Sequence, residues 1–136
     1  MLADHAEAVN GKLYVTGGCW DRLFAMQLPT QHPHLSLAAA IQVPWNATNE
    51  KHTFEVKVAD EDGHDVLPQP FSGQFEIGRP PGTPAGSDIT TLFVMNFNAL
   101  TFTKPGRYVF IVTVDGQELG RAGFDLIQMQ GFPVTG

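Results

Sequence analysis

In Lys104-Pro105-Gly106-Arg107-Tyr108-Val109-Phe110, a Pro-Gly turn stands directly before an apolar run that has a tyrosine near its start. Proline and glycine in succession are a strong turn signal. The run continues to Val114 with apolar residues on both faces, as in a strand that is covered on both sides. Asp115-Gly116 follows, and this dipeptide favours the two positive φ angles of a type I′ turn. The stretch therefore predicts a β-hairpin made of residues 107–114 and 117–129.

Short segments of alternating hydrophobicity extend outward from this hairpin. In the clearest of them, Phe54, Val56 and Val58 alternate with polar residues, which is the period-2 pattern of a strand with one buried face. Asn10-Gly11 carries the same type I′ turn signal as Asp115-Gly116. Glycines and prolines, 14 and 10 in number, fall between such segments, and none shows a helical period. Six further strands are predicted, at residues 3–9, 12–19, 35–43, 54–58, 71–78 and 89–98.

Eight strands joined by tight turns indicate an all-β chain folded as an antiparallel sandwich or a barrel. The Pro-Gly turn before Tyr108 resembles the tyrosine corner of immunoglobulin-like and fibronectin-like sandwiches, in which the phenol bonds to backbone a few residues upstream. Phe110 stands where antibody domains have a cysteine, so a true antibody-type domain is excluded. We therefore expect one domain over residues 1–136, an antiparallel Ig-like β-sandwich of about seven to nine strands.

The opening segment, Ala3-Asp4-His5-Ala6 through Asn10-Gly11 to Gly17-Gly18, resembles the start of a bacterial family of small uncharacterised proteins. The resemblance extends to the turn and strand at residues 104–116. It implies a β-sandwich of the immunoglobulin-like or fibronectin-like kind. It brings no activity and no catalytic residues.

Composition excludes several classes of partner. The 136 residues carry a formal net charge of -6, which repels phosphate backbones and anionic lipid surfaces, so no nucleic-acid partner is expected.

The N-terminus lacks the basic and apolar regions of a secretory signal. Apolar runs are too short for membrane insertion by a spanning helix. A single cysteine excludes an intramolecular disulfide. These features predict a cytoplasmic protein.

Three groups of residues could carry chemistry. Cys19 is either a nucleophile or a structural strand-end thiol, and no helix is predicted to follow it and lower its pKa. His32 and His34 could place two imidazoles on one side of an extended segment, and His5, His52 and His64 could join them in a metal site. The acidic turn at residues 60–65 offers carboxylates for calcium, but Phe71 occupies the position where a calcium loop has its glutamate. We expect no cofactor, no metal and no enzymatic activity.

Two tryptophans are candidates for ligand or partner contact. Trp20 follows Cys19, and Trp45 lies between Pro44 and Asn46 in a loop after a predicted strand. An exposed aromatic ring can stack on a sugar or anchor a protein partner. The alternative for Trp45 is that its ring caps the end of the core. The contact residues proposed on sequence grounds are Trp20, Trp45, His32 and His34.

Charge is distributed unevenly along the chain. Residues 23–49 and 89–103 contain no aspartate, glutamate, lysine or arginine, and residues 131–136 form a further uncharged terminus. A strand whose outer face carries serine, alanine and glutamine can be covered by another subunit without burying unpaired charge. We therefore predict a non-enzymatic binding or assembly module that contacts a protein partner or forms a homo-oligomer. The alternative is a module that binds a carbohydrate or another small neutral molecule.

Overall fold

The computed structural model describes residues 1–129, so the predicted uncharged segment at residues 131–136 lies outside the described part. The described chain is all-β, with a single turn of 3-10 helix, η1 (Trp45–Ala47). No described helix is long and apolar enough to cross a membrane. The strands of the described residues are β1 (Leu2–Val9), β2 (Lys12–Gly18), β3 (Arg22–Ala25), β4 (Thr30–Val43), β5 (Lys51–Asp60), β6 (Phe71–Glu76), β7 (Ile89–Phe102), β8 (Gly106–Val114) and β9 (Gln117–Gln128).

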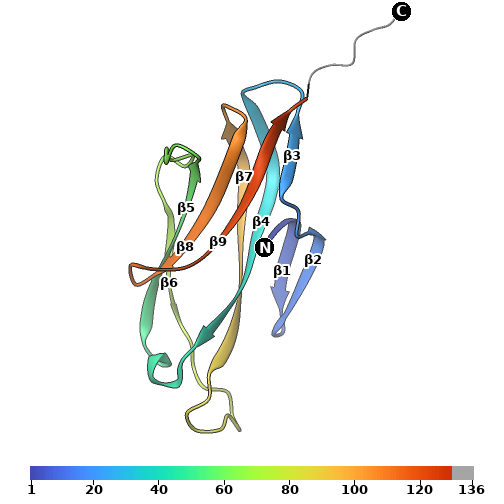
Figure 1. The fold of residues 1–136 in the computed structure, drawn as a ribbon. Helices are drawn as coiled ribbons and strands as arrows, with labels where there is room; N and C mark the ends of the chain where they lie inside the picture. The colour runs from blue at the N-terminus through green and yellow to red at the C-terminus, as the bar shows by residue number, and fades with distance from the viewer. Residues whose placement is uncertain (130–136) are drawn as a thin grey trace, which may run out of the picture.

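The strands form two sheets that pack against each other (Figure 1). A four-stranded sheet has the order β2-β1-β4-β7 and is antiparallel throughout. A five-stranded sheet has the order β3-β9-β8-β5-β6, and in it β3 runs parallel to β9, with Arg22 opposite Asp125. The expected antiparallel pairing is therefore correct for the first sheet and incomplete for the second. We refer to them as the four-stranded and the five-stranded sheet.

β3 is the strand that the sequence did not predict. It has only four residues, and only Ala25 among them is buried, so no alternating pattern is long enough to be recognised. Its partner β9 lies at the other end of the described chain, and no tight turn marks a parallel pair.

The two predicted type I′ turns are confirmed. Asn10 and Gly11 have φ angles of 50° and 73°, and they join β1 to β2 with Val9 opposite Lys12. Asp115 and Gly116 have φ angles of 51° and 80°, and they join β8 to β9. Both turns have two residues of positive φ, whose twist matches the right-handed twist of the flanking strands.

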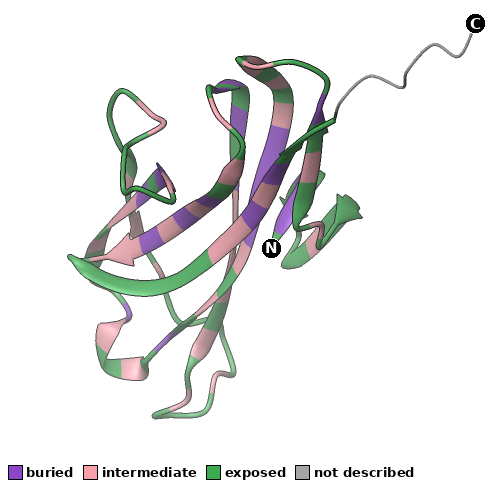
Figure 2. Ribbon diagram, turned by 45° about the horizontal axis from the view of Figure 1, so that its top comes forward, coloured by how far each residue is buried: buried purple, intermediate pink, exposed green. Residues whose placement is uncertain are grey.

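The core lies between the two sheets, where buried residues form bands along the facing strands (Figure 2). Phe124 of β9 is fully buried at its centre, with its ring 5.3 Å from that of Phe102 and 5.5 Å from that of Tyr108. The ring of Phe97 from the four-stranded sheet meets Phe110 of the five-stranded sheet at 5.4 Å. Aromatic pairs at these separations stabilise the contact beyond simple area burial.

The hydrogen bond predicted for Tyr108 is present. Its phenol donates to the carbonyl oxygen of Lys104, four residues upstream, at 2.6 Å. Burial raises the pKa of Tyr108, so its hydroxyl keeps the proton that makes this bond. The bond fixes the turn that leads into β8.

The two uncharged stretches pair with one another. β4 and β7 are antiparallel neighbours over their full lengths, from Thr30 opposite Phe102 to Val43 opposite Ile89. On the outer face, Ser36 and Ala38 are already buried. Met1, the residue before β1, exchanges backbone hydrogen bonds with Ala38, and β1 packs over Ser36 through the N–H of Ala6. Part of the neutral face therefore needs no second subunit to cover it.

β4 begins five residues earlier than predicted, and β7 extends four residues further. In the last part of β7, the buried residues change from odd-numbered positions, Met95 and Phe97, to even-numbered positions, Leu100 and Phe102. The change coincides with Ala99, which has a φ of 56° and lies beside Pro33 of β4. A left-handed residue reverses the alternation of side chains in the strand. The alternating pattern that predicted these strands stops at this point.

Candidate functional site

A row of polar side chains crosses the outer face of the four-stranded sheet. His5 comes from β1, His34 from β4 and Asn98 from β7, and His34 lies directly opposite Asn98 in the register. Nδ1 of His5 and Nε2 of His34 are 3.4 Å apart. Nδ1 of His34 is 2.7 Å from Oδ1 of Asn98, and Nε2 of His5 is 3.1 Å from Oε1 of Glu7. Three strands thus bring two imidazoles together, each held by an oxygen on its far side.

Ser36 lies beside this row but is bonded elsewhere. Its Oγ is 3.4 Å from Nε2 of His34, a distance that on its own would suit a serine–histidine pair. The hydroxyl, however, donates to Oδ1 of Asn96 at 2.6 Å and accepts from the backbone N–H of Ala6 at 3.1 Å. Ser36 is also fully buried. Its position fits a structural link between β1, β4 and β7 and does not fit a nucleophile.

His32 and His34 go to different partners. His34 joins His5 on the outer face, whereas the ring of His32 contacts Trp20, with centroids 6.3 Å apart. Burial lowers the pKa of His32, and the nearby Asp4 opposes that effect only in part. His32 pairs with the buried Leu100. It lies on the other side of Pro33 from His34, in the part of β4 where the alternation of side chains is reversed. The neutral ring therefore belongs to the edge of the core.

Trp20 is half-buried between the sheets and meets Phe124 edge-on, with ring centroids 5.7 Å apart. Its indole Nε1 is buried and has no hydrogen-bond partner among the described residues. Trp20 is packed against the core cluster. It is placed to close the side of the core, not to present an open aromatic face.

Trp45 begins η1, and its ring is covered on one face by Arg79. The guanidinium carbon of Arg79 is 3.7 Å from the ring centroid, which is a cation–π contact. Nε of Arg79 donates to Oγ1 of Thr48, and a terminal nitrogen donates to the carbonyl oxygen of Trp45. The face of the ring that Arg79 occupies cannot stack on a sugar.

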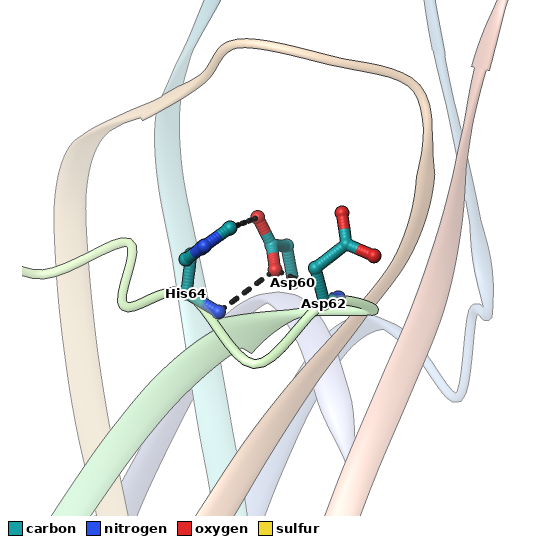
Figure 3. Close-up of side chains that lie close together, drawn as sticks. All are labelled: Asp60, Asp62 and His64. Atoms are coloured by element: carbon teal, nitrogen blue, oxygen red, sulfur yellow. Dashed lines mark hydrogen bonds and ion pairs between the residues drawn. The ribbon is translucent and has the colours of Figure 1, made fainter.

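The acidic turn after β5 brings Asp60, Asp62 and His64 together, with one potential ligand atom from each within 4.8 Å of the others (Figure 3). The ammonium of Lys104 already lies among them, 3.2 Å from Oδ2 of Asp60 and hydrogen-bonded to Asp62. Desolvation would raise the pKa of Asp60, but bonds from the backbone N–H groups of His64 and Asp62 and from Lys104 lower it overall. Asp60 therefore caps the turn, and the ammonium of Lys104 is the cation that accompanies the two carboxylates.

Cys19 is exposed at the end of β2 and has a φ of 61°. Its Sγ is 3.6 Å from Sδ of Met1. No described histidine or lysine forms a hydrogen bond or ion pair with this thiol. The strand-end interpretation fits its position better than the nucleophile interpretation.

His52 lies at the far end of the five-stranded sheet, next to the β8–β9 turn. Its Nε2 is 2.7 Å from the carbonyl oxygen of Ala47, and its Nδ1 is 2.7 Å from Oδ2 of Asp115. Both partners accept, so the doubly protonated ring is favoured, and the pKa of His52 is raised, first by the Ala47 carbonyl and then by Asp115. The bond from the Thr53 N–H, with that from His52, lowers the pKa of Asp115.

This pair should make stability depend on pH. Because the folded pKa of His52 is raised, its contribution is fully present below the unfolded value of 6.5 and is lost as pH rises through the folded value. We expect His52→Gln to destabilise the protein more at pH 5.5 than at pH 8.5, measured by urea denaturation. An equal loss at both pH values would contradict the assignment. His64→Gln serves as the control, because the exposed His64 ring makes a single contact with Asp60 at 3.5 Å.

The sequence allowed His5, His52 and His64 to join His32 and His34 in one site, whereas the structure brings only His5 and His34 together. Sequence reasoning named neither Glu7 nor Asn98. The alternating pattern could indicate that these side chains lie on outer faces, but only the register between β1, β4 and β7 shows which of them meet.

The fold and this surface define an all-β protein of two packed sheets with a histidine pair on the outer face of one of them. The chain belongs to a family of unknown function, DUF6941, which it matches over residues 1–127. No curated protein matches it. A solved structure of Pseudomonas fluorescens alkylpurine DNA glycosylase AlkC, bound to DNA containing an abasic site analog, is similar at a TM-score of 0.49 and 15% identity. The match covers 79% of this chain but only 28% of the glycosylase chain.

Proposed function

We propose that the chain is a non-enzymatic assembly module in which two copies join along the free edge of β7. The supporting observation concerns the edge strands of the described sheets. β7 has a hydrogen-bonded neighbour, β4, on one side only. It is the longest of the four edge strands, with 14 residues, whereas β2 has 7, β6 has 6 and β3 has 4.

Charge separates β7 from the other three edges. Lys12 lies in β2, Arg22 in β3 and Glu76 in β6, but β7 contains no charged residue. Native proteins commonly protect an edge strand with charge, proline or short length, because unpaired N–H and C=O groups attract another strand. A long edge without that protection supports the view that it has a partner.

A second copy is the partner that this strand fits. Two β7 strands related by a two-fold axis run antiparallel, so each can use the same unpaired backbone groups on the other. The two four-stranded sheets would then form one continuous sheet. With no charge on either strand, the pairing places no like charges opposite each other. Leu92 and Val94, half-buried on the outer face, would contact their counterparts near the junction.

Light scattering after size exclusion tests the proposal over a series of concentrations. We expect the mass to rise to about twice 14.8 kDa. Leu92→Lys should leave the chain monomeric where the wild type is dimeric, because two ammonium groups would meet across the axis. The matched control is Val15→Lys, which places lysine on β2, the opposite edge of the same sheet, and should leave the dimer intact.

Two results would overturn this function. One is a wild-type chain that stays monomeric at high concentration. The other is a dimer that survives Leu92→Lys but is lost in Val15→Lys, which would move the interface to β2. A monomer that captures another protein through β7 would keep the binding role and remove the self-association.

We also propose that the sandwich is related to the immunoglobulin-like class. The bond from Tyr108 to the Lys104 carbonyl oxygen supports this relation, because the same corner is a hallmark of those sandwiches.

A further inference from the structure

We propose that His5 and His34 form a binding site for a divalent transition-metal ion, with Zn²⁺ as the ion to test. The site lies on the outer face of the four-stranded sheet, where β1 and β4 run side by side. Both ligands come from inner strands, and only Asn98, which orients His34, lies on β7, so zinc binding by one chain does not require the assembly proposed above. Imidazole nitrogen is a good ligand for zinc, copper and nickel.

The hydrogen-bond partner of the outer nitrogen in each ring determines which of the two ring nitrogens carries the proton. Nε2 of His5 faces a carboxylate oxygen of Glu7 at 3.1 Å, and a carboxylate can only accept. Nδ1 of His34 faces the amide oxygen of Asn98 at 2.7 Å, which also only accepts. In the neutral rings, the protons therefore occupy these two outer nitrogens.

The inner nitrogens then carry lone pairs that face each other. Nδ1 of His5 and Nε2 of His34 are 3.4 Å apart. Ser36 does not satisfy either of them, because its hydroxyl proton is donated to Asn96. Two lone pairs at this distance repel each other unless a cation lies between them. A single metal ion between the two nitrogens would accept both lone pairs and remove that repulsion.

The separation of the two nitrogens suits one metal ion. Zinc binds imidazole nitrogen at about 2.0–2.1 Å in tetrahedral geometry, which places two nitrogen ligands roughly 3.3 Å apart. The observed 3.4 Å requires little movement of either ring.

The surroundings also match those of metal-binding histidines. Such residues almost always donate their other ring N–H to a carboxylate, a carbonyl oxygen or water, which fixes the ring and raises its basicity. Glu7 and Asn98 supply these contacts here. The side chain of His5 is 49% exposed, so water can complete the coordination. Two protein ligands with water define an open, exchangeable site of modest affinity.

Calorimetric titration with ZnCl₂ at pH 8 tests the site. We expect one ion to bind per chain in the micromolar range. His34→Ala and His5→Ala, which change different strands, should each weaken binding by about tenfold or more. His64→Ala is the matched control, since it removes a histidine from the acidic turn at Asp60 and should leave this binding unchanged.

Asn98→Ala tests whether the two histidines are oriented for metal binding or are only adjacent on the surface. It keeps both ligands and the net charge but removes the oxygen that orients His34. We expect a weakening of about tenfold. The proposal is overturned if the wild type shows no binding up to millimolar zinc, if both histidine variants bind as the wild type does, if His64→Ala abolishes binding, or if Asn98→Ala has no effect.

Discussion

Phe124→Ala is expected to lower the free energy of unfolding by about 3–5 kcal/mol, the usual cost of truncating a buried phenylalanine. Phe124 has no exposed surface and packs against rings from both sheets. Phe102 contacts it from the four-stranded sheet, Tyr108 stacks on it from β8, and Trp20 meets it from the side of the core. Because the removed ring is surrounded by rigid aromatic neighbours, the cavity cannot close easily.

The matched control is Phe24→Ala on β3, the strand next to β9. Phe24 is 60% exposed, so its removal should change the free energy by about 0.5 kcal/mol or less. Urea denaturation of the two variants gives both values. Similar losses in the two variants would mean that Phe124 is not at the centre of the core.

Ser36→Ala is expected to cost about 1–3 kcal/mol, although it removes a single oxygen atom. Ser36 is fully buried under β1 and accepts the backbone N–H of Ala6 at 3.1 Å. Ala6 is itself 1% exposed, so its N–H loses its partner without gaining water. Asn96, which accepts the serine proton, is exposed and can bond to water instead.

The Ser36 result can be separated from the intrinsic effect of serine in a strand. Ser72→Ala on β6 changes an exposed serine and should shift the free energy by about 0.5 kcal/mol or less. Hydrogen exchange at the Ala6 amide provides a second readout, and we expect it to become faster in Ser36→Ala. Unchanged exchange together with unchanged stability would show that β1 is held on β4 by its other contacts.

Local sequence signals predicted most of the fold. Asn10-Gly11 and Asp115-Gly116 determine their hairpins through the φ angles that those residues favour. Turn signals, alternation and runs apolar on both faces together predicted eight of the nine described strands. The missed strand, β3, is held by a parallel partner distant in sequence. The same limit applies to the order of strands within a sheet: the uncharged stretches of β4 and β7 pair side by side, and no local pattern indicates this pairing.

The candidate site was predictable in its parts and not in its arrangement. His34 belongs to an alternating strand, so its outward position follows from the pattern of Leu35 and Leu37. The adjacent His32 does not follow that pattern, because the left-handed Ala99 on the neighbouring strand reverses the alternation beyond Pro33. The partner of His34 is His5, some thirty residues away, and only the packing of β1 on β4 brings the two rings together.

The parallel pairing of β3 with β9 has a consequence for the order in which the protein folds. The β8–β9 and β1–β2 hairpins close over two-residue turns and can form locally within microseconds. β3 must instead join a strand at the opposite end of the described chain, after the intervening strands have shortened the distance between them. Such distant pairing places the chain among slowly folding β-proteins, on a scale of milliseconds to seconds. A ribosome must therefore release the chain through the end of β9 before the five-stranded sheet can be completed.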